Sequence, residues 1–166
     1  MELDPVFSDD WPEDAAILGR AEAAAEAASA VAPELANPRL SVSLLFTGDA
    51  EVHALNREWR DRDKPTNVLS FPMLGREELL DLAPDGPPVL LGDIALAHDT
   101  CAREAEEKGL SLDHHAAHLI VHGLLHLAGH DHVHSDEEAE AMEALEIAAL
   151  AKMGIADPYG DRHSTE

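Results

Sequence analysis

Histidine placement constrains this chain more than any other feature of its sequence. Eight of the eleven histidines lie between His114 and His134. Five of them recur at every fourth position, namely His114, His118, His122, His126 and His130. Because an α-helix has 3.6 residues per turn, this spacing puts the five on one slowly drifting stripe. Residues 112–128 are therefore predicted to form a helix that stops at Gly129.

Three histidines in this region have the spacing of metal ligands. His122 and His126 are one helical turn apart, with Cβ atoms about 5–6 Å apart, so both imidazoles can reach one ion. Gly129 tolerates a left-handed helix stop, after which the chain can turn back and offer His132. Three imidazoles with an open fourth position are typical of catalytic zinc, so one zinc ion per chain is predicted. Asp131 could orient a ligand imidazole, or it could only cap the turn.

The other histidines have simpler interpretations, and one zinc chemistry is disfavoured. Metzincin peptidases share this histidine spacing, but they need a glutamate directly after the first histidine as general base. Gly123 stands there and cannot take up a proton, so peptidase activity is not expected. His114 and His115 are expected to be exposed on the helix, and His118 to be buried or to support His122.

The remaining pattern predicts an α+β domain with a small mixed sheet of about four strands packed by about five helices. Alternating or β-branched apolar residues indicate strands at 3–7, 40–46, 67–71 and 89–97. Helical spacing and end signals indicate helices at 13–31, 50–59, 99–108, 112–128 and 136–152. Residues 1–166 are expected to form a single domain. Within it, 75–88 would be a surface loop with room for one short helical turn, and 155–166 a tail.

Charge restricts where nucleic acid could bind. The chain has 34 acidic and 11 basic residues, a net charge of −23 at pH 7. Such a field repels nucleic acid over most of the surface, so binding would need a local basic cluster. One cluster exists, made of Arg57, Arg60, Arg62 and Lys64. Acidic residues are interleaved with it, so it could equally be a solvated helix end and loop.

Cysteine content and hydropathy predict a cytoplasmic protein without membrane association. Cys101 is the only cysteine, which excludes an intramolecular disulfide and a paired-cysteine zinc site. The first residues lack the basic and apolar regions of a secretory signal. No run approaches the roughly 18 uncharged apolar residues of a membrane span.

Three blocks of this sequence resemble the YbeY family of bacterial endoribonucleases, which participate in rRNA maturation. The run HGLLHLAGHDH, residues 122–132, is similar to the family signature. Leu55-Asn56 with Arg60 and TNVLSFP, residues 66–72, resembles a second family segment, and residues 91–94 resemble its central strand. The blocks occur in the family's order within residues 40–132. The family usually has tyrosine where this chain has His130, which puts an aromatic contact there in doubt.

The resemblance implies a zinc-dependent, single-strand-selective endoribonuclease that acts in rRNA maturation, ribosome biogenesis and ribosome quality control. It implies metal ligands at His122, His126 and His132, and makes His122 and Arg60 the candidate catalytic residues. Asn67 and Ser70, in the second segment, are candidates for contacts to the ligands or to the substrate. The implied partners are single-stranded rRNA and the ribosome or a ribosome-associated protein, and neither DNA nor a membrane.

Other interpretations stay open. The chain could be a non-catalytic, zinc-stabilised ribosome-associated factor, or a hydrolase of another small substrate, because fold does not fix function. Arg60 could line a cleft, where guanidinium suits phosphoryl oxygens, or could only cap the helix before it. The residues identify no general base, and the 2'-hydroxyl of RNA could itself be the nucleophile. Removing Arg60 distinguishes an enzyme from the non-catalytic factor, because an enzyme would lose cleavage and keep its zinc.

Overall fold

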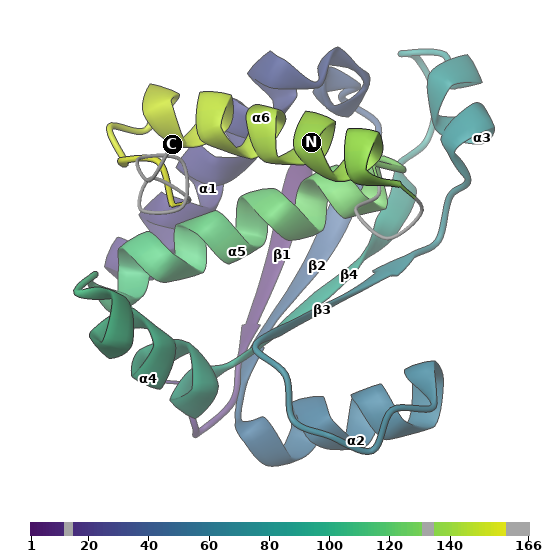
Figure 1. Ribbon diagram of the computed structural model, residues 1–166. Helices are drawn as coiled ribbons and strands as arrows, with labels where there is room; N and C mark the ends of the chain where they lie inside the picture. Colours follow the sequence, from purple (N-terminus) through teal and green to yellow (C-terminus); the bar gives the residue numbers. More distant parts are fainter. Residues whose placement is uncertain (12–14, 131–134, 159–166) are drawn as a thin grey trace.

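A four-stranded mixed sheet forms the centre of the fold (Figure 1) in the computed structural model, which describes residues 1–11, 15–130 and 135–158. Its strands are β1 (Glu2–Phe7), β2 (Leu40–Thr47), β3 (Val68–Pro72) and β4 (Val89–Ala97). The spatial order is β1-β2-β4-β3; β1, β2 and β4 run parallel, and β3 is antiparallel to β4. The predicted α+β class with a mixed sheet is thus confirmed.

Strand β2 shows why these residues form a sheet. Leu40, Val42, Leu44 and Phe46 alternate with half-buried positions and have no exposed surface. Side chains two residues apart point to the same face of a strand, so this set faces the core on one side of the sheet. An apolar pattern like that of residues 66–71 does not by itself distinguish an interior strand from an edge strand. In the structure β3 is an edge of the sheet.

Helices cover both faces of the sheet. In the described residues they are α1 (Ala15–Val31), α2 (Asp49–Arg60), α3 (Arg76–Asp81), α4 (His98–Lys108), α5 (Leu112–Leu127) and α6 (Asp136–Lys152), with a 3₁₀ turn at Pro33–Ala36. Figure 1 shows α1, α5 and α6 gathered on one side of the sheet and α2 on the other. No helix in the described part of the chain is long and apolar enough to cross a bilayer.

Residues 75–88, predicted as a surface loop with room for one short helical turn, contain the short helix α3 (Arg76–Asp81). Leu79 of this helix is 2% exposed and joins the main core, which explains why the segment is ordered locally. The Glu78 side chain accepts a hydrogen bond from the Gly75 backbone N–H at 3.3 Å and so satisfies the helix start. At the other end of the chain, Ile155 stands at the start of the predicted tail and is buried in the core.

The core lies mainly between the sheet and the helices α1, α5 and α6. A smaller cluster on the opposite face packs α2 onto the sheet through Val52, Leu69, Ala95 and Ala97. Gly123 brings α5 close to β4, because a Cβ at this position would lie 2.9 Å from Cδ1 of Ile94. The helix that carries the histidine stripe is therefore seated directly on the sheet.

Helix α5 begins and ends close to where the sequence predicted, but His114 and His115 are less exposed than predicted. Ser111 accepts a hydrogen bond from the backbone N–H of His114 at 3.3 Å and caps the start, and Gly129 follows the end with φ of +97°. His118 is buried, in line with the prediction. The expected exposure of His115 is wrong, because this side chain faces α4 and is only 1% exposed; His114 is half-buried.

Candidate functional site

A cleft of about 410 Å³ opens at the β3 edge of the sheet. Asn56 and Arg60 of α2 form one wall, and residues of the loop and of β3 between 62 and 70 form another. The third wall is the C-terminal half of α5, with His122, Gly123 and His126. Three segments that are far apart in the sequence meet here. Among them are the predicted site residues Arg60, Asn67, Ser70, His122 and His126.

Each of the two cleft histidines is held through its Nδ1 atom. The Ser70 hydroxyl lies 2.6 Å from Nδ1 of His126, which ties α5 to the edge strand. Nδ1 of His122 is hydrogen-bonded to Oε1 of Glu146 on α6. When a histidine binds a metal through Nε2, its Nδ1–H is commonly donated to a carboxylate or another oxygen. In both imidazoles Nδ1 is engaged by an oxygen atom, an arrangement common to histidines that coordinate through Nε2.

Glu146 is a site residue that sequence reasoning missed. Its side chain is 1% exposed, and its second oxygen lies 3.7 Å from Nε2 of His118. A signal was present in the sequence, because Glu146 interrupts the apolar face of α6 that contains Met142, Ala149 and Leu150. A carboxylate on such a face is rarely buried without a partner. The histidine stripe of α5 provides that partner.

Arg60 crosses the cleft from the last turn of α2. Its guanidinium donates a hydrogen bond to the Ser70 carbonyl and lies 5.4 Å from the ring centroid of Phe71. The chain turns directly after it, since Asp61 has a left-handed φ of 55°. The described geometry therefore directs the side chain of Arg60 to β3. A guanidinium has five N–H donors, so one bond to Ser70 does not exhaust its capacity.

The loop after α2 brings further positive charge to the cleft. Asn56 holds this loop with two hydrogen bonds. Its side-chain Nδ2 donates to the Lys64 carbonyl at 3.0 Å, and its backbone carbonyl accepts the Arg62 N–H at 3.2 Å. Arg60, Arg62 and Lys64 thus line the cleft, three of the chain's 11 basic residues. The interleaved Asp63 is paired with His53 at 2.7 Å. The cleft is locally basic in a strongly acidic protein.

His132 is the third predicted metal ligand. His132 and Asp131 lie outside the described residues. Within the ranges 1–11, 15–130 and 135–158, no group of three or more His, Cys, Asp or Glu side chains is arranged to hold a metal ion. The chemistry of the part that is described fits zinc, because two imidazoles one turn apart, each held through Nδ1, share one cleft wall.

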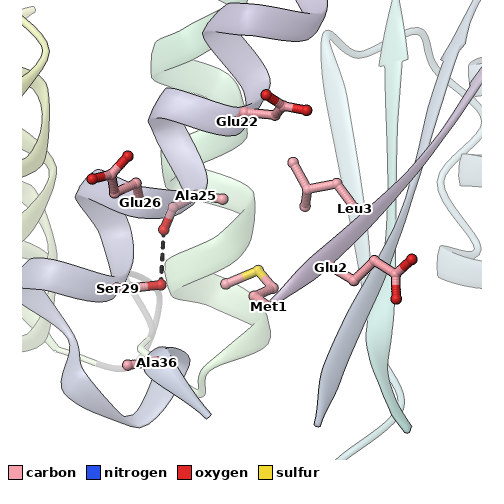
Figure 2. A pocket seen from close by; sticks show the side chains of 8 residues that line it. All are labelled: Met1, Glu2, Leu3, Glu22, Ala25, Glu26, Ser29 and Ala36. Carbon is pink, nitrogen blue, oxygen red and sulfur yellow. Dashed lines mark hydrogen bonds between the residues drawn. The ribbon is translucent and has the colours of Figure 1, made fainter. Parts of the chain in front are cut away.

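A larger cavity, of about 580 Å³, lies between β1 and α1 and is built differently (Figure 2). Its lining contains Glu2, Glu22 and Glu26 together with apolar side chains. Ser29 in its wall donates to the Ala25 carbonyl at 2.8 Å. Three carboxylates would repel a phosphate group. The smaller cleft at β3 is therefore the candidate site for an anionic substrate.

Fold and cleft together define the class: an α+β protein with a histidine-bearing helix and a basic loop at the open edge of a mixed sheet. Residues 14–154 match the family model described as Endoribonuclease YbeY, and the chain belongs to this family. The resemblance of the three sequence blocks is confirmed.

Relatives named endoribonuclease YbeY match most of the chain. The Erythrobacter litoralis protein is 74% identical over 139 residues, which cover 84% of this chain and 86% of the relative. The Novosphingobium aromaticivorans protein is 60% identical over 162 residues, with 96% and 93% covered. The solution structure of TM1509 from Thermotoga maritima superposes with a TM-score of 0.60 at 20% identity, over 98% of this chain and 93% of that one. This last match shows the fold alone.

Proposed function

We propose that this protein is a zinc-dependent, single-strand-selective endoribonuclease that acts in rRNA maturation, ribosome biogenesis and ribosome quality control. Family membership supports the endoribonuclease activity. The observation that carries the proposal is the cleft itself, in which Arg60 and two Nδ1-anchored imidazoles line the same space. A phosphodiester placed there would contact a fixed cation and the predicted metal ligands together.

Electrostatics support a single RNA strand as the substrate. The chain's net charge of −23 opposes nucleic acid, whereas Arg60, Arg62 and Lys64 make this cleft locally attractive to it. Affinity for isolated RNA should therefore be weak and fall steeply with salt. We propose that the ribosome, or a ribosome-associated protein, delivers the rRNA to the cleft in the cytoplasm. DNA is not the proposed substrate, because the 2'-hydroxyl of RNA is itself a possible nucleophile at the phosphodiester.

Arg60 would bind and orient the phosphoryl group. Its guanidinium is positioned by the Ser70 carbonyl and by the face of Phe71, so the planar donors are held before substrate binds. Paired N–H donors suit two phosphoryl oxygens and stabilise the charge that develops on them. Preorganised donors of this kind typically contribute about a hundredfold or more to the rate.

His122, His126 and the predicted third ligand His132 would hold the zinc ion. When bound, zinc supplies Lewis acidity in the cleft. Glu146 and Ser70 engage Nδ1 of the two imidazoles, so the proposed coordination uses Nε2 of each ring. Glu146 and Ser70 thus position the ligands, and a measurement of zinc affinity tests this role without RNA cleavage.

The test compares cleavage of a labelled single-stranded rRNA fragment by wild type, Arg60→Ala and His126→Ala, with zinc measured in each. Arg57→Ala is the matched control, because Arg57 is exposed on the same helix and does not line the cleft. We expect cleavage by wild type and by the control alone. Arg60→Ala should lose about a hundredfold or more of the rate and keep its zinc. His126→Ala should lose both.

Three results would reject parts of the proposal. Equal cleavage by all four proteins would show a contaminating ribonuclease. Absence of cleavage in all four, with zinc bound to wild type, would favour the non-catalytic zinc-stabilised factor. Full activity of wild type after removal of zinc by a chelator would show that cleavage does not depend on zinc. The proposed endoribonuclease activity would then stand without the metal.

A further inference from the structure

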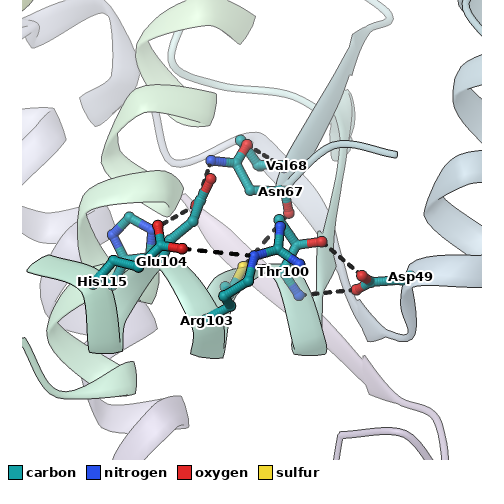
Figure 3. Close-up of polar contacts among 9 residues, drawn as sticks. Asp49, Asn67, Val68, Thr100, Arg103, Glu104 and His115 are labelled. Atoms are coloured by element: carbon teal, nitrogen blue, oxygen red, sulfur yellow. Dashed lines mark hydrogen bonds and ion pairs between the residues drawn. The ribbon is translucent and has the colours of Figure 1, made fainter. Parts of the chain in front are cut away.

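A carboxylate behind the cleft joins its edge strand to two helices. Glu104 of α4 accepts a hydrogen bond from Nδ2 of Asn67 at 2.8 Å and lies 2.9 Å from Nε2 of His115 on α5 (Figure 3). Asn67 lines the cleft and directly precedes β3. A single side chain thus connects α4, α5 and the residue where the chain starts the edge strand.

Asn67 is fixed by its other groups as well. Its side-chain oxygen accepts the Val68 N–H at 2.7 Å, as the short dashed line in Figure 3 shows. Its carbonyl accepts the Ala97 N–H at 2.9 Å, and the Cys101 thiol lies 3.6 Å from the same oxygen. With both ends of the amide and the carbonyl engaged, Asn67 cannot turn without breaking several hydrogen bonds at once.

His115 gives Glu104 a rigid second support. The imidazole is 1% exposed, and its Nδ1 has no hydrogen-bond partner among the described residues. Burial lowers the pKa of His115, so the ring is neutral and its single proton serves the bond to Glu104. A buried atom without a partner costs free energy, and such groups in native structures call for an explanation. The arrangement keeps the Glu104 contact in spite of this cost.

Two hydrogen-bonded connections therefore hold β3 against α5. His115, near the start of α5, reaches Asn67 through Glu104, and His126, near its end, reaches Ser70 directly. Ser70 also receives Arg60 on its carbonyl. The placement of β3 along α5 decides whether Arg60 and the histidines line the same space.

We propose that Glu104 is a positioning residue for this cleft, which acts through Asn67 to hold β3, and with it Ser70 and Arg60, in place against the histidine helix. This inference rests on the proposed endoribonuclease function. Misplacement of reacting groups by about 1 Å can cost roughly a hundredfold in rate, so a residue outside the cleft can control turnover. Glu104 itself would touch neither substrate nor metal.

The experiment compares Glu104→Ala and Glu104→Gln with a control, Glu107→Ala. Glu107 is exposed on the same helix and forms a surface ion pair with Arg103 at 4.0 Å. For each zinc-loaded protein, kcat and KM on labelled single-stranded RNA would be measured well below the unfolding midpoint, together with bound zinc and amide hydrogen exchange. We expect Glu104→Ala to lower kcat about 10- to 100-fold with zinc retained and KM changed less than about threefold.

Two further readouts separate positioning from general support of the fold. Exchange of the β3 amides should rise at least about tenfold in Glu104→Ala, while the β2 amides and the control stay as in wild type. Glu104→Gln should regain most of kcat, because its amide oxygen can still accept from Asn67. The double variant with Asn67→Ala should be no slower than Asn67→Ala alone, since residues that act through one another are not additive.

The outcomes decide the inference independently of the proposed activity. Unchanged β3 exchange in Glu104→Ala, or loosened β3 with unchanged kcat, would overturn it. If wild type does not cleave RNA, the proposed function fails and hydrogen exchange alone decides whether Glu104 positions β3. If Glu104→Ala does not fold, Asn67→Ala takes its place in the exchange measurement, because it removes the same hydrogen bond from the other side.

Discussion

The Ser70 hydroxyl and Nδ1 of His126 are 2.6 Å apart, although 56 positions separate the two residues in the chain. The contact joins the edge strand β3 to the helix α5 inside the cleft. The same residue, Ser70, accepts Arg60 on its carbonyl. One strand residue thus orients both a predicted metal ligand and the predicted substrate-binding arginine.

Removing the Ser70 hydroxyl should weaken the zinc site. Ser70→Ala leaves His126 without its orienting partner on β3, and loss of such a partner typically costs about 10- to 100-fold in metal affinity. Ser43→Ala, a half-buried serine of β2, is the matched control. Zinc affinity would be measured by competition with a chelating dye. Equal affinity of the two variants would show that the contact does not support the metal.

Glu146 of α6 should also support zinc binding, because it orients the imidazole of His122. Glu146→Ala removes the partner of Nδ1 of His122 and the carboxylate oxygen that lies 3.7 Å from Nε2 of His118. We expect zinc affinity to fall about 10- to 100-fold, and Glu146→Gln to lose less because its amide oxygen still accepts a hydrogen bond. Glu140→Ala, exposed on the same helix, is the control. Wild-type zinc affinity in Glu146→Ala would contradict the assignment.

Trp59 should report RNA binding. It precedes Arg60 on α2 and is 67% exposed, whereas the other tryptophan, Trp11, is 2% exposed. Stacking of a base on an exposed aromatic side chain contributes about 1–3 kcal/mol, so single-stranded RNA should quench emission at low salt. Trp59→Leu should abolish the quench and weaken binding at least about fivefold. RNA binding detected by anisotropy without any change in emission would exclude the stacking.

Stability should depend on pH through His115. Burial lowers the pKa of this imidazole, so below the ordinary value of about 6.5 the unfolded chain takes up a proton that the folded protein does not. The neutral imidazole therefore makes its full contribution to the free energy of unfolding above about pH 6.5. As the pH falls below this value, the free energy of unfolding decreases by up to about 1.4 kcal/mol per pH unit. Urea unfolding between pH 5 and 8 would show it. The free energy of unfolding of His115→Gln should fall less steeply with decreasing pH than that of wild type. Parallel curves of this free energy against pH for the two proteins would refute the prediction.

Cys101 should be chemically inert in the folded protein. Its side chain has no exposed surface, and burial, together with the charges of Glu104 and Asp49, raises the pKa of the thiol to about 12. The thiolate is the reactive form, so iodoacetamide should not label native protein at pH 8. Full labelling in denaturant provides the control, monitored by intact mass. Rapid native labelling would mean that α4 opens readily.

Most of the fold could be predicted because it follows from local patterns. The four strands, the helix with the histidine stripe and its stop at Gly129 each arise from the periodicity or conformational preference of neighbouring residues. The short helix α3 was less visible, since one buried side chain, Leu79, anchors it. His115 was misjudged for a related reason. A polar residue on a helix is assumed to face water until its partner, here Glu104, is known.

The sequence by itself determined the histidine spacing, the basic cluster around Arg60 and the membership of a family whose blocks lie in a fixed order. Only the tertiary structure decided which partners hold these groups: Ser70 for His126, Glu146 for His122 and Glu104 for Asn67. Helical and strand periodicity are set by backbone geometry within a few residues. Pairings between groups 24 to 56 residues apart depend on how the helices pack on the sheet, and local patterns do not encode that packing.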